Sequence, residues 1–229
     1  MDLKGGIKIE FLGHSGFLIS YGNNGSAKRI VIDPYNISEI VASNKADFIL
    51  ITHSHYDHCS IKDIEKLKKE TTVIVCPPDV QSKITRVEGI RMELIEAGEE
   101  LTLGKFKVEA IPAYNIDKEF HTKKDGWIGY LIKIDNVVIY HSGDSDKTND
   151  MQRVSGYGKH GVEFVALLPV SGKYVMSAEE AADAAKMINP SIVIPMHYGA
   201  GVVGTIEDAQ RFVEICKQEG LDARILEKI

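Results

Sequence analysis

Four potential metal ligands follow one apolar run within six positions of the chain. The run over residues 48–52 leads into His53, His55, Asp57 and His58. Alternation along a strand predicts that His53 and His55 point to the same side, and a turn brings the next two ligands round. Imidazoles with a carboxylate suit divalent zinc, iron or manganese. The pattern therefore predicts a metal site, against the alternative of a polar surface loop.

Three further residues could complete and support this site. Asp144 and His197 each follow an apolar run, and each fits a hydrogen-bonded loop residue as well as a metal ligand when taken singly. Together with the first cluster they supply the ligands for a second ion. Asp33 ends another apolar run and could accept a hydrogen bond from a ligand histidine. The alternative for Asp33 is a turn residue, because Pro34 follows it.

The order His-Ser-His-Tyr-Asp-His at residues 53–58 resembles the HxHxDH signature of the metallo-β-lactamase fold hydrolases, and the similarity covers most of the chain. The resemblance implies an α/β fold, a four-layer αβ/βα sandwich with two divalent ions at the edge between its sheets. Zinc or manganese is expected, with iron as a further option. By this resemblance Asp144 bridges the ions, His197 completes the second site, and Asp33 orients ligands.

The expected chemistry is hydrolysis of a lactone, an ester or a phosphodiester by a metal-bound hydroxide, since metal-bound water ionises near neutral pH. Asp57 is the candidate to bind metal and to accept the proton of that water. Three segments, over residues 12–17, 140–145 and 195–199, resemble the branch that includes ascorbate-6-phosphate lactonase. That resemblance makes His14 a second candidate catalytic residue and substrate contact. The alternative is a hydrogen-bonded turn histidine.

The sequence departs from the family pattern at the third histidine of the first ion. Asn115 stands where a histidine is typical, and the next histidine is His121. We expect His121 to reach the ion from a loop, whereas Asn115 or water is the alternative. Without His121 the first ion would bind weakly, and one metal could serve.

The elements that must position these residues can be predicted from apolar periodicity and turn residues. We expect strands over 7–12, 17–20, 29–32, 48–52, 72–76, 91–95, 106–111, 129–134, 137–140, 164–168 and 192–195. We expect helices over 61–70, 178–188 and 206–219, the last two begun by capping boxes of Ser177 with Glu180 and of Thr205 with Asp208. Turns are expected at residues 23–25 and 135–136. The pattern indicates two sheets packed face to face with helices outside.

Composition limits the compartment and the partners. A length of 229 residues favours one domain over 1–229, and the net charge of -6 disfavours a general binder of nucleic acid. No apolar run approaches the roughly 18 residues of a membrane span, and residues 1–9 lack the apolar core of a secretory peptide. We therefore expect a cytoplasmic protein with no membrane partner. Cys59, Cys76 and Cys216 are expected to be reduced thiols.

A small-molecule substrate, with or without a phosphate group, is the expected partner, and a homo-oligomer stays open. One alternative is a metal-dependent nuclease or phosphodiesterase acting on single-stranded nucleic acid. Net acidity and the lack of an added arm or inserted domain disfavour it. The other is a non-catalytic metal-binding or ligand-binding module. A ligand set that mixes acids with histidines and leaves room for water disfavours that reading.

Overall fold

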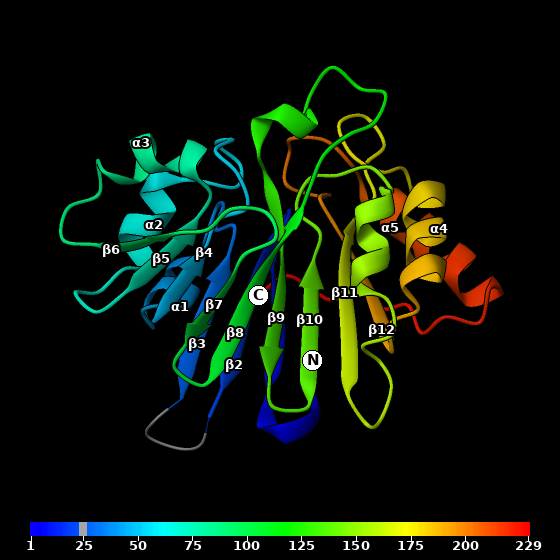
Figure 1. The fold of residues 1–229 in the computed structure, drawn as a ribbon, viewed down its shortest axis with the longest axis horizontal. Coiled ribbons are helices and arrows are strands. Elements are labelled where there is room, and N and C mark those ends of the chain that lie inside the picture. The colour runs from blue at the N-terminus through cyan, green and yellow to red at the C-terminus, as the bar shows by residue number, and fades with distance from the viewer. Residues whose placement is uncertain (23–26) are drawn as a thin grey trace. The chain divides into compact units, whose positions relative to one another are not determined.

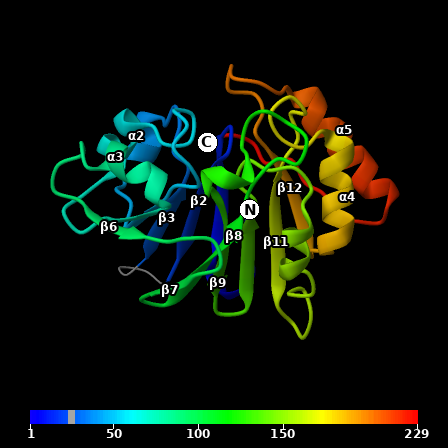
Figure 2. The same ribbon diagram turned by 45° about the horizontal axis from the view of Figure 1, so that its top comes forward.

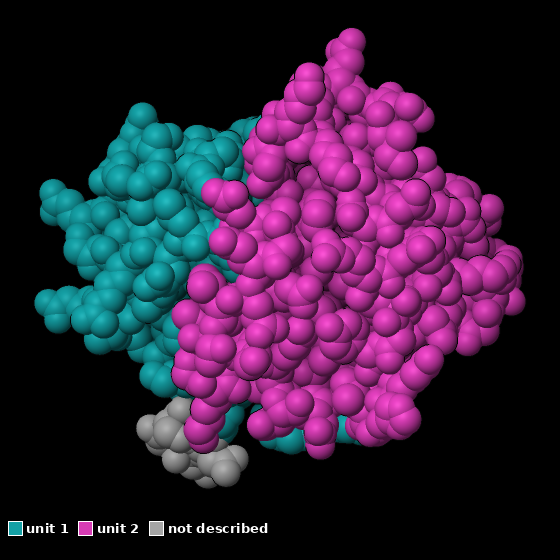
Figure 3. All heavy atoms as spheres, in the orientation of Figure 1, with its two compact units in different colours: residues 1–95, 226–229 teal, residues 96–225 magenta. Residues whose placement is uncertain are grey.

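The structure, a computed structural model, describes residues 1–22 and 27–229. These residues form two compact units, unit 1 of residues 1–95 and 226–229, and unit 2 of residues 96–225 (Figure 3). Each unit contains its own six-stranded sheet. The turn expected at Asn23, Asn24 and Gly25 lies outside the described residues, and a single domain over 1–229 stays a prediction. Within the described ranges, no helix combines the length and the apolar character needed to cross a membrane.

The sheet of unit 1 has the strand order β1-β2-β3-β4-β5-β6 (Figure 1). Its strands are β1 (Lys8–Gly13), β2 (Gly16–Tyr21), β3 (Lys28–Ile32), β4 (Phe48–Leu50), β5 (Val73–Cys76) and β6 (Arg91–Leu94). Strand β2 is antiparallel to both β1 and β3, whereas β3 to β6 pair in parallel. Because β1 runs in the same direction as β3, the segments after β1, β3, β4 and β5 all leave the same edge of the sheet.

Short helices cover one face of this sheet. They are α1 (Glu39–Ala42), α2 (Ile61–Leu67) and α3 (Gln81–Ile84), with 3-10 turns η1 (Lys4–Gly6) and η2 (Pro78–Val80). Ile64 of α2 and Ile84 of α3 are fully buried in one cluster with Ile49 and Ile74 of the sheet. Burial of such side chains contributes about 2 kcal/mol each to folding, and it fixes the helices against β4 and β5.

Unit 2 repeats the plan with the strand order β12-β11-β10-β9-β8-β7. Its strands are β7 (Glu100–Leu103), β8 (Phe106–Pro112), β9 (Ile128–Ile134), β10 (Val137–His141), β11 (Glu163–Pro169) and β12 (Ile192–Met196). Neighbours from β7 to β10 are antiparallel, and β10, β11 and β12 are parallel. The segments after β8, β10, β11 and β12 therefore leave one edge of this second sheet.

Two longer helices, α4 (Ala178–Ile188) and α5 (Ile206–Gln218), pack against each other and against β11 and β12 (Figures 1 and 2). The 3-10 turns η3 (Lys123–Asp125) and η4 (Asn149–Val154) complete the unit. Both expected capping boxes are present. The turn at Asp135 is also present, with a positive φ of 48°.

Several expected boundaries differ from the structure. The helix from Ile61 ends at Leu67. Besides the 3-10 turns, the described residues form α1, α3 and β7, which periodicity did not predict. The two helices are single turns of four residues each, and β7 alternates exposed glutamate and threonine with half-buried leucine. Elements this short carry too little periodicity to be recognised.

Candidate metal centre

The predicted ligands of unit 1 gather where β1, β3 and β4 end. His14 follows β1, Asp33 follows β3, and residues 53–58 follow β4. The ring centroids of His53 and His55 lie 4.8 Å apart, and those of His53 and His58 lie 4.1 Å apart. The carboxyl ends of parallel strands are a common place for ligand sites in α/β sheets. The side chains that the sequence predicts for the first metal cluster are therefore neighbours in this unit.

The first cluster is shaped by an early end to β4. Ile51 N–H still donates to Val75 O at 2.9 Å, but Thr52 N–H donates to Asp33 Oδ1 at 2.8 Å instead of to a neighbouring strand. The expected strand over 48–52 is therefore two residues too long. A turn follows, in which His58 N–H donates to His55 O at 3.1 Å. The histidines meet in this irregular segment, not by alternation along a strand.

Asp33 sets the ring orientation of two histidines. Its Oδ2 atom accepts a hydrogen bond from His58 Nδ1 at 2.8 Å and another from Thr52 Oγ1 at 2.7 Å. Because the Thr52 hydroxyl donates to Asp33, its oxygen accepts from His53 Nδ1 at 2.9 Å. With both Nδ1 atoms protonated, a neutral His53 and a neutral His58 each present an Nε2 lone pair. That is the tautomer that a metal ion requires.

Asp57 and His14 form a contact beside these rings. His14 Nε2 lies 2.9 Å from Asp57 Oδ2, and His58 Nε2 lies 3.8 Å from the same oxygen. One ligand atom from each of these residues lies within 4.8 Å of the others. Imidazole nitrogens with a carboxylate oxygen at this spacing fit a divalent ion of the zinc or manganese type.

Ser54, between His53 and His55, is held through its backbone by two residues that sequence reasoning missed. Ser54 N–H donates to Asp79 Oδ2 at 3.2 Å, and Lys83 Nζ donates to Ser54 O. Asp79 lies in η2 after β5, and Lys83 lies in α3. The only signal in the sequence is the Pro77-Pro78-Asp79 turn after an apolar run, and it does not reveal this contact.

Unit 2 holds a second cluster at the corresponding edge of its own sheet. Asp144 follows β10, and His197 follows β12. Asp144 Oδ2 lies 3.1 Å from His197 Nε2 and 3.6 Å from His121 Nε2. Ser171, which follows β11 and was not predicted, places its Oγ atom 2.9 Å from His197 Nδ1. Two imidazoles therefore face one carboxylate oxygen, a second donor set that suits a divalent ion.

The loop between β8 and β9 carries both Asn115 and His121. The Asn115 side-chain amide donates to Phe120 O at 2.9 Å and to Tyr174 O at 2.6 Å. Asn115 N–H donates to His121 O at 2.6 Å. These bonds use the backbone and the side-chain amide nitrogen of Asn115 to hold the loop that carries His121, and they leave its side-chain oxygen out. His121 as the ligand, with Asn115 as the alternative, stays a prediction.

Four predicted site residues have left-handed backbone conformations. The φ angles are 56° at His14, 44° at Asp33, 59° at His121 and 64° at His197. Non-glycine residues pay a conformational cost there, although histidine and aspartate tolerate it better than most. Such strain persists only where the surrounding structure enforces it, and it is concentrated at functional sites.

Two neighbouring ionisable side chains, Cys59 and Tyr198, stay uncharged near neutral pH. Burial raises the pKa of the Cys59 thiol to about 12, with smaller effects from nearby charges. Burial also raises the pKa of Tyr198, next to His197, to about 12. All three cysteines are buried, and none forms a disulfide. Their reduced state stays a prediction. The negative charge of each cluster therefore comes from its carboxylates.

Known proteins resemble this chain both in sequence and in fold. Residues 8–197 match the family model described as a β-lactamase superfamily domain. A UPF0173 metal-dependent hydrolase of Pyrococcus furiosus is 32% identical over 200 residues, 84% of each chain. One of Nanoarchaeum equitans is 31% identical over 228 residues, 97% of each chain. A crystal structure from Parabacteroides distasonis, described as a metal-dependent hydrolase, has a TM-score of 0.81 at 28% identity, covering 99% of this chain and 97% of that one.

These matches first define a class, since they confirm the expected α/β metallo-β-lactamase fold with two mixed sheets and helices. Within that class the chain belongs to the UPF0173 family of metal-dependent hydrolases. It is a hydrolytic enzyme, as expected. The matches do not extend the resemblance to the ascorbate-6-phosphate lactonase branch.

Proposed function

We propose that the two clusters supply one centre of two divalent ions, zinc or manganese, which hydrolyses a lactone, ester or phosphodiester bond in a small molecule. The proposed ligands are His53, His55, Asp57, His58, His121, Asp144 and His197. The observation that carries the proposal is the arrangement around Asp33, where one buried carboxylate orients His58 directly and His53 through Thr52. A carboxylate behind ligand histidines is typical of metal sites.

The residues of the chain have separate tasks in this reaction. Bound divalent ions supply Lewis acidity and make water easier to ionise. Asp57 is the proposed acceptor of the proton from the attacking water. His14, 2.9 Å from Asp57 Oδ2, is proposed to orient that carboxylate and to contact the substrate. Asp33 stays outside the ligand set and holds the histidine tautomers.

The substrate class follows from the metal chemistry and from the charge of the chain. A net charge of -6 favours a small molecule over a polymeric polyanion. The lactonase resemblance makes sugar-derived lactones, phosphorylated or not, the first compounds to examine. A cytoplasmic location and a homo-oligomer remain predictions.

The first test measures metal content by mass spectrometry on protein purified without added metal. We expect about two ions per chain in the wild type and about one in His121→Ala, because each ion needs three or four protein ligands. His160→Asn is the matched control, since His160 is exposed and also has a positive φ, which asparagine tolerates. It should keep about two ions.

The same samples are then assayed on lactones, esters, phosphodiesters and a labelled single strand of nucleic acid. Hydrolysis should disappear with chelator and return with metal. A wild type that holds no metal after reconstitution would refute the proposal. Metal retention without turnover on any substrate would favour the binding module, and degradation of the single strand alone would favour the nuclease.

A further inference from the structure

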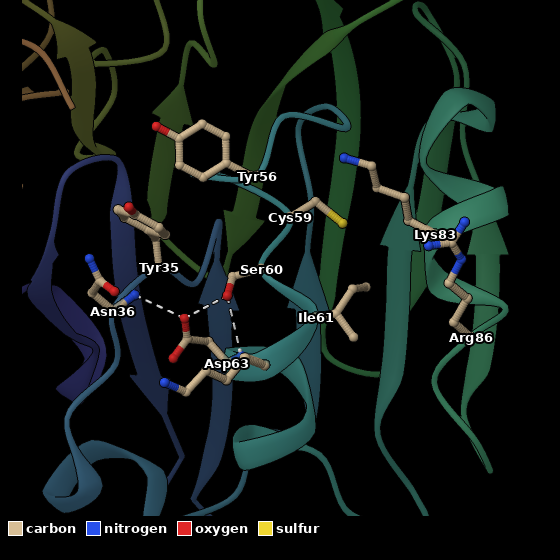
Figure 4. Close-up of a pocket in the computed structure, with 10 residues that line it drawn as sticks. Tyr35, Asn36, Tyr56, Cys59, Ser60, Ile61, Asp63, Lys83 and Arg86 are labelled. Carbon is tan, nitrogen blue, oxygen red and sulfur yellow. Dashed lines mark hydrogen bonds between the residues drawn. The ribbon is translucent and has the colours of Figure 1, made fainter.

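A pocket of about 460 Å³ opens in unit 1 beside the predicted ligands (Figure 4). It lies between α2, α3 and the segment after β3. Its walls are formed by Tyr35, Asn36, Tyr56, Cys59, Ser60, Ile61, Lys62, Asp63, Lys83 and Arg86. In Figure 4 the two tyrosines stand on one side, Lys83 points inward from the other side, and Arg86 stands beside Lys83.

The residues that line the pocket include more cationic side chains than carboxylates. Among its walls Lys62, Lys83 and Arg86 are cationic, and Asp63 is the one carboxylate. Asp63 is already used by the fold, because it accepts from Asn36 N–H at 2.9 Å, Ile37 N–H at 3.1 Å and Ser60 Oγ at 2.7 Å. None of the three cations forms an ion pair with a residue in the described part of the chain, and Lys83 donates to a backbone carbonyl.

A pocket of similar size in unit 2 provides a contrast. It measures about 530 Å³ and is also lined by three lysines. There, however, Lys118 is paired with Asp146, and Lys123 lies 3.2 Å from Asp150. Two of those lysines are therefore held in ion pairs. Lys62, Lys83 and Arg86 form no such ion pair in the described part of the chain, although Asp79 lies near Lys83, since both contact the Ser54 backbone.

The unit 1 pocket adjoins the candidate metal residues. Tyr56 and Cys59 flank Asp57 and His58 in the chain, and both line the pocket. The Tyr35 ring lies 5.8 Å from the His14 ring and 5.9 Å from the Tyr56 ring. Tyr56 is 62% exposed, so a ligand in the pocket can reach its ring. A molecule at Asp57 could thus extend along the tyrosines toward the cations.

We infer that this pocket binds an anionic group of the substrate, a phosphate or a carboxylate, through Lys62, Lys83 and Arg86. The inference rests on the proposed function for its connection to hydrolysis. The Tyr35 and Tyr56 rings pack along the part of the molecule between that anion and the bond that is cut. Anionic hydrogen-bond acceptors gain more from such donors than neutral acceptors do.

The test is calorimetric titration of the full chain, as purified, with phenyl phosphate, benzoate and phenol at one ionic strength. These probes share the ring and differ in the anionic group. We expect at least one anion to bind and phenol to bind more weakly. Arg86→Met and Lys62→Met should each weaken anion binding by about 10-fold, as loss of one charged contact does. Lys83 is left unchanged because it also holds Ser54.

Exposed cations outside the pocket supply matched controls, Arg91→Met for the arginine and Lys105→Met for the lysine. Both should leave anion binding unchanged. Binding of phenyl phosphate alone would assign a phosphate, and binding of benzoate alone a carboxylate. No anion binding, or binding that neither pocket variant weakens, would overturn the inference. Metal content of the same samples separates the two hypotheses, since absent metal with variant-sensitive anion binding contradicts only the proposed function.

Discussion

Thr52 connects a ligand histidine to the carboxylate that orients it. Replacing Thr52 with valine removes the hydroxyl between His53 and Asp33 but keeps the side-chain shape and the backbone bond to Asp33 Oδ1. We expect Thr52→Val to weaken metal binding by about 10-fold, the lower end for residues that support metal ligands. Competition with a coloured chelator measures this. Thr52→Ser restores the hydroxyl and should restore metal affinity. An unchanged metal affinity in Thr52→Val would show that the Thr52 hydroxyl does not orient His53 for metal binding.

Asp47 should make stability depend on pH in the acid range. Its pKa lies below the ordinary value although burial alone would raise it, because Lys28, Lys69 and the Arg29 N–H donate to it. A lowered folded-state pKa gives stability that is present above the unfolded-state pKa and is lost as pH falls through the folded value. Asp47→Asn should therefore cost about 1 kcal/mol at neutral pH and less in acid.

Urea unfolding of Asp47→Asn and the wild type between about pH 7 and pH 2 measures this difference, because protonation removes the same charge that the variant lacks. Asp135→Asn, at an exposed turn position that asparagine also tolerates, is the control. A cost for Asp47→Asn that stays constant across this range would contradict the assignment to charge.

At the residue level, types and spacing were enough to predict that the side chains at residues 53–58 lie together, because four potential ligands fall within six positions. Their role as metal ligands stays a prediction. The supporting contacts could not be selected in the same way. Ser171 reaches His197 across 26 positions, and Lys83 reaches Ser54 across 29. Such contacts are created by strand order, and single-sequence periodicity contains no information about which strands are neighbours.

Strand β9 must pass close to the segment that carries Asp144. A Cβ atom on Gly129 would lie 2.5 Å from His141 O and 2.6 Å from Ser142 O, distances that only a backbone shift can relieve. Gly129→Ala should therefore destabilise the protein by about 2 kcal/mol and weaken metal binding, since Ser142 lies two residues before Asp144. Urea unfolding and metal titration measure the two effects.

Gly104→Ala is the control for this variant. Gly104 has a positive φ of 66°, but a Cβ atom there meets no atom within 4 Å. It should cost about 1 kcal/mol through backbone strain and leave metal affinity unchanged. Equal metal affinity in Gly129→Ala and the wild type would show that the close approach does not position Asp144.

At the level of elements, long periodic segments were predicted well and strand ends were not. The helix α4 was predicted with its bounds, because Ser177 and Glu180 mark its start and the apolar alanines define one face. The predicted end of β4 was wrong because Thr52 N–H donates to the Asp33 side chain and not to a neighbouring strand. Periodicity describes which face a residue prefers, and it does not describe such competition for backbone donors.

At the level of the whole molecule, a centre with ligands from both units, as proposed, should link the stability of unit 1 to that of unit 2. The proposed ligands come from unit 1 and from unit 2, so metal binding should raise the unfolding temperature of both. At a free metal concentration of 100 times Kd, each bound ion adds about 2.7 kcal/mol. Hydrogen exchange of α2 in unit 1 and of α4 in unit 2, with metal and with chelator, measures the effect for each unit.

Protection that rises with metal in only one unit would contradict a shared centre. His121→Ala and His197→Ala test the link from unit 2, because each should reduce the gain in α2 as well as in α4. A single unfolding transition with metal would also support the expectation of one domain over 1–229. Two transitions at every metal concentration would oppose it.

The left-handed backbone at His14, Asp33, His121 and His197 has an evolutionary consequence. Each backbone would be less strained with glycine, by about 1 kcal/mol. At Asp33 the hydrogen bonds to Thr52 and His58 oppose that gain, because glycine would leave buried donors unpaired. In a library selected only for folding, we expect the three histidine positions to drift toward glycine or asparagine. In a library selected for metal-dependent turnover, they should persist. The positions at which the two libraries diverge would then identify the residues retained at the expense of stability.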